Sequence, residues 1–200
     1  MLMTHGEPKT LLFFGPSGAG KGTQIKLLSD VLKGQSDREI IYIEMGALLR
    51  KMVEEGTYSG SLTKDIIESA SLMPGFMPVY LTTKQLVNNF TGEEHIVADG
   101  AVRQPDQARG FDDAMKFYKR ENYEVVVMQL SPESITKRLL LRGRNDDTEE
   151  GIHKRIGWYN EEVEPLLEIF KERGRTIHHI DGEPTVEEIH KNILETLKLA

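Results

Sequence analysis

The fold of this chain is decided by one glycine-rich stretch, Gly15-Pro16-Ser17-Gly18-Ala19-Gly20-Lys21-Gly22-Thr23-Gln24. An apolar run at 11–14 precedes it and a helical pattern over 25–32 follows, so the order is strand, glycine loop, helix. Glycines let backbone N–H groups approach an anion closely, and a helix N-terminus adds partial positive charge. We therefore expect a phosphate-binding loop, with Lys21 reaching the outer phosphates and Thr23 offering a hydroxyl to phosphate or a cation. Gly22 departs from the strict Gly-x4-Gly-Lys-Ser/Thr pattern, and the alternative is an ordinary glycine-rich turn between strand and helix.

The composition restricts the class of protein. Two hundred residues fit one domain, 1–200, and the net charge of -7 argues against nucleic acid as a partner. The absence of cysteine excludes disulfides and thiol catalysis. We see neither a signal-peptide pattern nor an apolar run of the roughly 18–20 residues that a membrane span needs, so we expect a cytoplasmic protein with no membrane contact.

Apolar runs alternate with helical patterns along the chain, which predicts an α/β fold with a parallel five-stranded sheet and helices on both faces. The expected strands cover 11–14, 40–43, 95–100, 123–130 and 176–180. Two short helical patterns, around 46–55 and 61–69, predict a small helical insertion at 44–76. Ligands bind such sheets beyond the carboxyl ends of the strands. The glycine loop and three strand ends should therefore line one cleft, the strand ends being Glu44 to Gly46, Asp99-Gly100 and Asp181-Gly182.

Four arginines surround a break in the helical pattern at Gly143, namely Arg138, Arg142, Arg144 and Arg155. A helical hairpin would bring them together, and guanidinium groups suit phosphate oxygens. In an acidic protein this concentration predicts an anion clamp. The alternative is a solvated helix face on which the arginines pair with neighbouring carboxylates.

Three further side chains follow strand ends. Arg50 and Arg103 should face the mouth of the cleft. Asp99 is the natural acid to hold magnesium, directly or through water, although a helix cap or loop carboxylate is the alternative for it.

Several stretches together are similar to the motifs of one family, and they span most of the chain. They are the glycine loop with glycine after its lysine, Met45-Gly46-Ala47-Leu48-Leu49-Arg50, Asp99-Gly100-Ala101-Val102-Arg103 with Gln107, Arg142 with Arg144-Asn145-Asp146-Asp147 and Arg155, and the late Asp181-Gly182. They resemble the adenylate kinase family of nucleoside monophosphate kinases. The resemblance implies a P-loop NTPase-type fold, with 44–76 as the insertion that binds the monophosphate and a minimal lid at 142–148.

The resemblance also implies roles for individual residues. ATP would be bound by Gly18, Ala19, Gly20, Lys21, Gly22, Thr23 and Arg142. The acceptor would be bound by Met45, Arg50, Met73, Gly100, Arg103, Gln107, Arg144 and Arg155, with Gln107 reading the base. Phosphoryl transfer would depend on Lys21, Arg103, Arg142, Arg144 and Arg155, and Mg²⁺ would be held near Asp99 through water.

The resemblance is incomplete at three places. Met45 stands where the family has threonine, Ala47 where it has an acid near the magnesium, and Ala101-Val102 where it has Phe-Pro. We predict an ATP:AMP phosphotransferase that acts as a monomer. The alternatives are a uridylate or cytidylate kinase on the same fold, and a catalytically weak nucleotide-binding protein.

Overall fold

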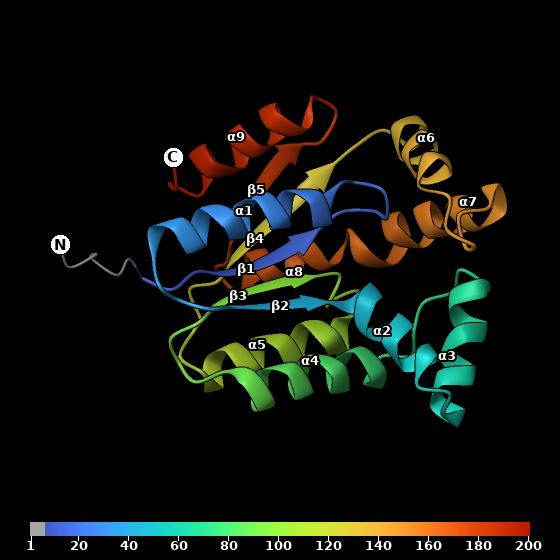
Figure 1. Cartoon of the computed structure of the whole chain (residues 1–200), viewed down its shortest axis with the longest axis horizontal. Coiled ribbons are helices and arrows are strands. Elements are labelled where there is room, and N and C mark those ends of the chain that lie inside the picture. The colour runs from blue at the N-terminus through green and yellow to red at the C-terminus, as the bar shows by residue number, and fades with distance from the viewer. Residues whose placement is uncertain (1–6) are drawn as a thin grey trace.

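The computed structural model describes residues 7–200 and contains one parallel sheet (Figure 1). Its strands run side by side in the order β2-β3-β1-β4-β5. Their bounds are β1 Thr10–Phe14, β2 Ile40–Glu44, β3 His95–Asp99, β4 Glu124–Gln129 and β5 Thr176–Asp181. Every neighbouring pair is parallel. The five predicted strands and the predicted parallel sheet are therefore confirmed.

Helices connect the strands and cover both faces of the sheet. They are α1 Lys21–Gln35, α2 Met45–Glu54, α3 Tyr58–Glu68, α4 Phe76–Asn89, α5 Pro105–Phe117, α6 Pro132–Arg142, α7 Glu149–Trp158, α8 Leu166–Glu172 and α9 Val186–Thr196. In Figure 1, α1 and α9 lie on one side of the sheet, and α4, α5 and α8 lie on the other. The pairs α2/α3 and α6/α7 project beyond the carboxyl ends of the strands, which the arrowheads in Figure 1 mark.

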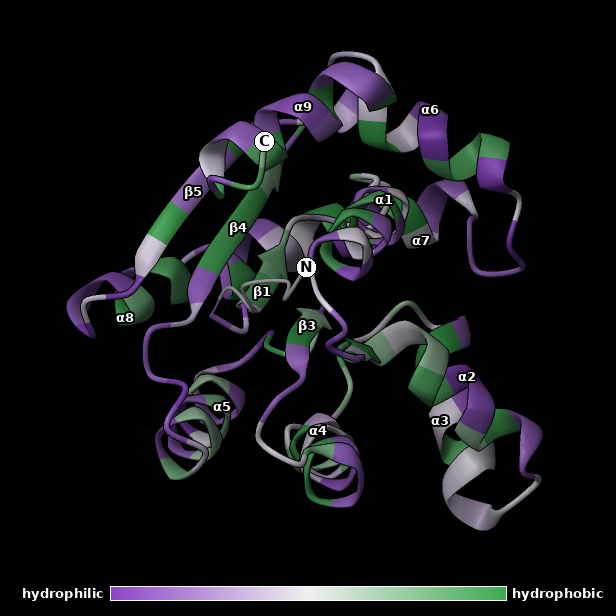
Figure 2. Ribbon diagram, turned by 60° about the vertical axis from the view of Figure 1, so that its left-hand side comes forward, coloured by the Kyte–Doolittle hydropathy of each residue, from purple (hydrophilic) through white to green (hydrophobic). Residues whose placement is uncertain are grey.

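Each face of the sheet has its own core. Buried side chains of α4, α5 and α8 pack on one face, with Phe14 and Ile43 among the strand residues. Those of α1 and α9 pack on the other, with Phe13 and Val97. Figure 2 shows hydrophobic and hydrophilic segments alternating along these helices, and buried residues such as Leu28 of α1 and Leu86 of α4 belong to the two cores. Because successive strand residues point to opposite faces, a strand between two helical layers is buried along its whole length, as β1 is.

Local rules account for the starts of several helices. Thr57, Ser131, Thr148 and Thr185 each cap a helix by accepting a backbone N–H bond. The Thr57 cap starts α3 at Tyr58, earlier than the expected 61. The helical stretch after Thr148 is divided before Pro165: α7 ends at Trp158, a π-helical turn covers Tyr159–Val163, and α8 begins after the proline. Proline has no N–H to continue the ladder, which accounts for the break.

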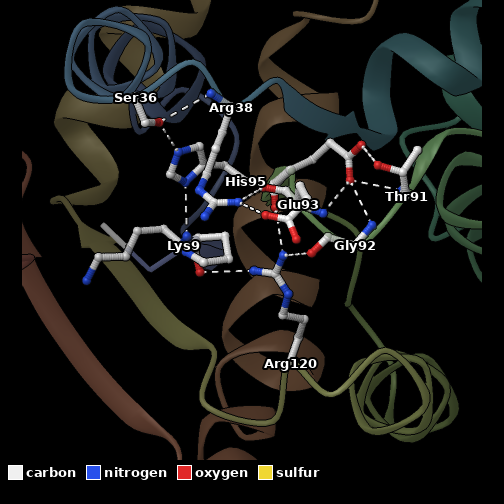
Figure 3. A network of polar contacts seen from close by, with 10 residues as sticks. Lys9, Ser36, Arg38, Thr91, Gly92, Glu93, His95 and Arg120 are labelled. Carbon is white, nitrogen blue, oxygen red and sulfur yellow. Dashed lines mark hydrogen bonds and ion pairs between the residues drawn. The ribbon is translucent and has the colours of Figure 1, made fainter. Parts of the chain in front are cut away.

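The amino ends of the strands are joined by polar contacts (Figure 3). The Lys9 backbone N–H donates to Nδ1 of the buried His95 at 2.9 Å, and His95 Nε2 lies 3.1 Å from Ser36 Oγ. Burial, followed by the charges of Arg38, Arg120 and Lys9, lowers the pKa of His95. The neutral ring therefore holds the start of β1 beside the start of β3. This contact lies at the amino end of the sheet, opposite the end that carries the glycine loop.

Over the described range 7–200, no helix is long and apolar enough to cross a membrane.

Candidate functional site

A cavity of about 650 Å³ opens at the carboxyl end of the sheet. It is lined by the glycine loop, by side chains from α2 and α3, by the end of β3, and by side chains from α6 and α7. Most of the residues predicted from the sequence line it: Gly18, Ala19, Gly20, Lys21, Gly22, Thr23, Arg50, Met73, Asp99, Arg103, Arg142, Arg144 and Arg155. The fold thus gathers into one cavity residues that are up to 137 positions apart, from Gly18 to Arg155.

The glycine loop needs its glycines at two positions in particular. Gly15 and Gly18 have φ of +142° and +86°. A Cβ would lie 2.8 Å from the Met128 carbonyl oxygen at Gly15, and 2.9 Å from Leu139 Cγ at Gly18. The loop then enters α1 at Lys21, and no side chain caps that helix. The first N–H groups of a helix have no intrahelical partner, so α1 can present them, with its partial positive charge, to an anion.

The Lys21 ammonium lies within this loop. Its Nζ donates to the carbonyl oxygens of Gly15 at 2.9 Å and Pro16 at 3.1 Å, and it lies 3.6 Å from Asp99 Oδ1. Burial lowers the pKa of Lys21, while the Asp99 carboxylate raises it. Asp99 therefore helps to keep a buried lysine in its charged form.

A second acid stands beside Asp99. Glu44 ends β2 in direct register with Asp99 at the end of β3, and both line the cavity. Residues in register on parallel strands point to the same face, and the strands lie about 4.8 Å apart. Tyr42 shares this face two residues earlier, and burial, then the Asp99 and Glu44 carboxylates, raise its pKa. Glu44 Oε1 accepts a bond of 3.1 Å from Arg50 Nη2.

Two of the four arginines around Gly143, Arg142 and Arg155, converge on a buried carboxylate. The Asp147 side chain has no exposed surface, and it accepts bonds from Arg142 Nε (2.8 Å) and Nη2 (2.7 Å) and from Arg155 Nη2 (2.8 Å). Arg155 also pairs with Asp146 at 2.9 Å. Burial raises the pKa of the Asp147 carboxyl, but the bonds from Arg142 and Arg155 outweigh this and the pKa lies below its usual value.

The remaining arginines differ in how firmly they are held. Arg138 Nη2 donates to the Gly182 carbonyl at 2.8 Å. Within residues 7–200, the guanidinium groups of Arg103 and Arg144 make no hydrogen bond or ion pair, although both line the cavity. Their donors are thus left for an anionic ligand.

Three of the predicted acceptor-binding residues do not line this cavity. The Met45 side chain is 1 % exposed and belongs to the core. The Gln107 amide is engaged within the protein, with Oε1 accepting from Arg103 N–H at 2.7 Å and Nε2 donating to Gln104 Oε1 at 3.2 Å. Gly100 lies under Arg103 and lines a smaller neighbouring pocket. Their contacts with an acceptor base stay predictions.

Sequence reasoning assigned no individual binding role to several residues of the cavity wall, among them Glu44, Arg138 and Trp158. Glu44 was placed at a strand end but given no role, because only the strand register shows that it stands beside Asp99. Arg138 was placed in the predicted anion clamp, but the resemblance gave it no role of its own. Trp158 was given no role from the sequence, yet it lines the cavity. No local sequence signal distinguishes a packing tryptophan from one that also forms part of a site.

Comparisons with known proteins agree with the geometry. The protein-family model described as adenylate kinase matches residues 13–175. An adenylate kinase of Prochlorococcus marinus (strain MIT 9301) is 32% identical over 189 residues, which cover 94% of this chain and 98% of that protein. One of Leptospira biflexa serovar Patoc is 34% identical over 193 residues, covering 94% and 100%. One of Corynebacterium glutamicum (strain R) is 34% identical over 187 residues, covering 94% and 98%.

Proposed function

The chain belongs to the adenylate kinase family, a family of phosphotransferases that use ATP as the phosphoryl donor, and we propose that it transfers the terminal phosphoryl group of ATP to AMP. A phosphate oxygen of AMP forms the new bond to the γ-phosphorus, the bond from that phosphorus to the bridging oxygen breaks, and two molecules of ADP result. The acceptor phosphate is already ionised, so no general base is required. The observation that carries this proposal is the single cavity in which Lys21 and the helix N-terminus share the wall with Arg103, Arg142, Arg144 and Arg155.

The donor half of the site is the glycine loop with α6. In our proposal, Gly18 to Thr23 hold the phosphates of ATP through backbone N–H groups, and Lys21 and Arg142 neutralise charge on them. Arg138 lies between the loop and Gly182, since a Cβ at Gly20 would lie 3.9 Å from its Nη1. Preorganised donors of this kind stabilise charge that develops in the transition state.

The acceptor half is formed by α2, α3 and the segment after β3. We propose that Arg50 and Arg103 bind the phosphate of AMP and that Arg144 and Arg155 reach the transferring phosphoryl group. Residues 44–76 would serve as the acceptor-binding insertion and 142–148 as a short lid. Gln107 and the backbone near Met73 would contact the base, with Met45 behind them in the core.

Magnesium suits the donors that are present. Mg²⁺ in phosphate sites keeps several waters and uses one or two carboxylates together with substrate phosphates. Asp99, with 14 % of its side chain exposed, and the Thr23 hydroxyl offer hard oxygen ligands at the loop. When bound there, the ion would neutralise phosphate charge, with Asp99 acting through water. We also propose that the protein acts as a monomer in the cytoplasm, where ATP and AMP are abundant.

A coupled assay for ADP tests the proposal. It measures formation of ADP from ATP with AMP, GMP, UMP or CMP, and we expect the highest kcat/KM with AMP. Lys21→Ala should lower turnover by orders of magnitude, about 100-fold or more, and leave the circular dichroism spectrum unchanged. A preference for UMP or CMP would move the assignment to a pyrimidine monophosphate kinase. Turnover of none of the four by the folded parent would refute phosphotransfer.

A further inference from the structure

Trp158, the single tryptophan of the sequence, ends α7 at the point where the chain turns into the π-helical segment. Its indole lines the main cavity and the smaller pocket beside it. The indole ring makes a cation–π contact with Arg103, and its N–H donates to Ala70 at the end of α3. These two partners are more than 30 residues apart in the sequence.

The first contact holds a guanidinium that has no other polar partner. Arg103 Cζ lies 5.2 Å from the centroid of the Trp158 ring. Gly100 also lies close to this guanidinium, since a Cβ there would lie 3.0 Å from Arg103 Nη2. Within residues 7–200 the guanidinium makes no hydrogen bond or ion pair, and the indole face is the aromatic contact that restrains it. An arginine held in one orientation loses less conformational entropy when it binds an anion.

The second contact fixes the end of the insertion. Trp158 Nε1–H donates to the Ala70 carbonyl oxygen at 3.0 Å. Ala70 has a left-handed backbone with φ of +53°. An alanine adopts this conformation at a cost in free energy, which contacts with its surroundings must offset. Ala70 lies against α7, since a Cβ at Gly151 would be 3.5 Å from Ala70 Cβ. Ala70, Ser71 and Met73 then form part of the cavity wall.

We propose that Trp158 is a positioning residue of the acceptor site, which orients Arg103 with its ring and fixes the end of α3 with its N–H. This inference rests on the proposed function, because it assumes that the acceptor monophosphate binds beside Arg103. Within residues 7–200, no hydrogen bond or cation–π contact joins the indole to the glycine loop, Lys21 or Arg142. The indole therefore governs affinity for the acceptor and leaves ATP binding and the chemical step nearly unchanged.

Two substitutions separate the two contacts. Trp158→Phe keeps an aromatic face for Arg103 and removes the N–H, whereas Trp158→Leu removes both. A matched control is Phe170→Leu, a fully buried aromatic residue in the same core cluster that contributes nothing to the cavity wall. This control reports the effect of lost stability alone.

Steady-state kinetics give the first measurement. We expect Trp158→Leu to raise KM for AMP about 3- to 30-fold, the range that the loss of one cation–π contact corresponds to, with kcat and KM for ATP within about 2-fold of the parent. Trp158→Phe should give a smaller rise, and Phe170→Leu none. An unchanged KM for AMP in Trp158→Leu would overturn the proposal. An equal rise in KM for AMP and for ATP would overturn it as well.

Amide hydrogen exchange without nucleotide gives the second measurement and does not depend on turnover. Trp158→Phe should speed exchange at 66–71, where the backbone bonds of Ala70 and Ser71 to Ile67 and Ile66 close α3. Exchange equal to that of the parent would refute the role of the Trp158 N–H in fixing the end of α3. A folded parent that transfers no phosphoryl group to any monophosphate refutes the proposed function instead, and with it the role of Trp158 at an acceptor.

Discussion

Replacing Asp147 with asparagine should be among the most damaging conservative changes in this chain. The side chain is fully buried, and its carboxylate receives three bonds from two arginines and a fourth of 3.2 Å from the Arg144 backbone N–H. Asparagine keeps the size but removes the charge, and it turns one acceptor into a donor that faces a guanidinium. Breaking a buried ion pair costs about 3–5 kcal/mol. For a chain of this length, 1 kcal/mol shifts Tm by about 2–4 °C, so Tm should fall by about 6–20 °C.

Asp146→Asn is the matched control. Its carboxylate is 24 % exposed and forms one ion pair, with Arg155. A partly exposed pair contributes about 0–1 kcal/mol, so Tm should change by no more than about 4 °C. Both variants are compared with the parent by thermal unfolding, and their turnover is measured at 20 °C. The Asp147 variant should also lose turnover, because Arg142 and Arg155 lose the group that aligns them.

The pH dependence tests the charge itself. The pKa of Asp147 is lowered on folding, so its contribution is fully present above the unfolded value of about 3.9 and is lost as pH falls through the folded value. The difference in Tm between parent and Asp147→Asn should therefore be constant from pH 7 to about 5 and narrow below about 4. A variant that unfolds at the parent's temperature at pH 7, or a difference that stays the same at low pH, would refute this account.

Three further changes test the cavity wall and the core beside it. Asp99→Asn removes the carboxylate that raises the Lys21 pKa, so at saturating magnesium the alkaline limb of the kcat/KM profile should move to lower pH; an unmoved limb would show that Lys21 does not depend on Asp99. Gly18→Ala places a Cβ 2.9 Å from Leu139 Cγ at φ +86°, so calorimetry should show ATP binding weakened at least about 10-fold. Gly34 has open space around it, so the control Gly34→Ala should bind ATP as the parent does. Met45→Thr buries a hydroxyl in an apolar core and should cost about 1–3 kcal/mol in urea unfolding; a variant as stable as the parent would place Met45 outside the core.

The sheet could be predicted because its signals are local. The apolar runs, the glycine loop and caps such as Ser131 before Pro132 are read from a few neighbouring residues, and the parallel arrangement follows from their alternation with helices. The loop residues Gly18 to Thr23 were found for the same reason. Their motif combines backbone conformation, charge and a helix start within one short stretch.

Other parts of the site depend on contacts between distant segments. The pairing of Glu44 with Asp99 requires the register of two strands, which no spacing within either strand reveals. The burial of Met45 reflects how α2 packs on the sheet. Gln107 is held by Arg103 and Gln104, so its amide orientation is a tertiary result as well. The sequence placed these residues near the strand ends and left their partners undetermined.

The strand order has a consequence for how the chain folds during synthesis. β1, which leads into the glycine loop, is made before the other strands of this sheet, but it pairs only with β3 and β4, at residues 96–99 and 124–127. Ribosomes add about 5–20 residues per second, so the apolar segment Leu11 to Phe14 waits about 6–23 s before its second neighbour exists. Sequence-distant pairing of this kind makes folding slow and leaves strand edges open to aggregation. A nascent chain stalled before β4 should therefore depend on chaperones, and β1, which leads into the phosphate loop, gains both of its neighbours only after β4 has been translated.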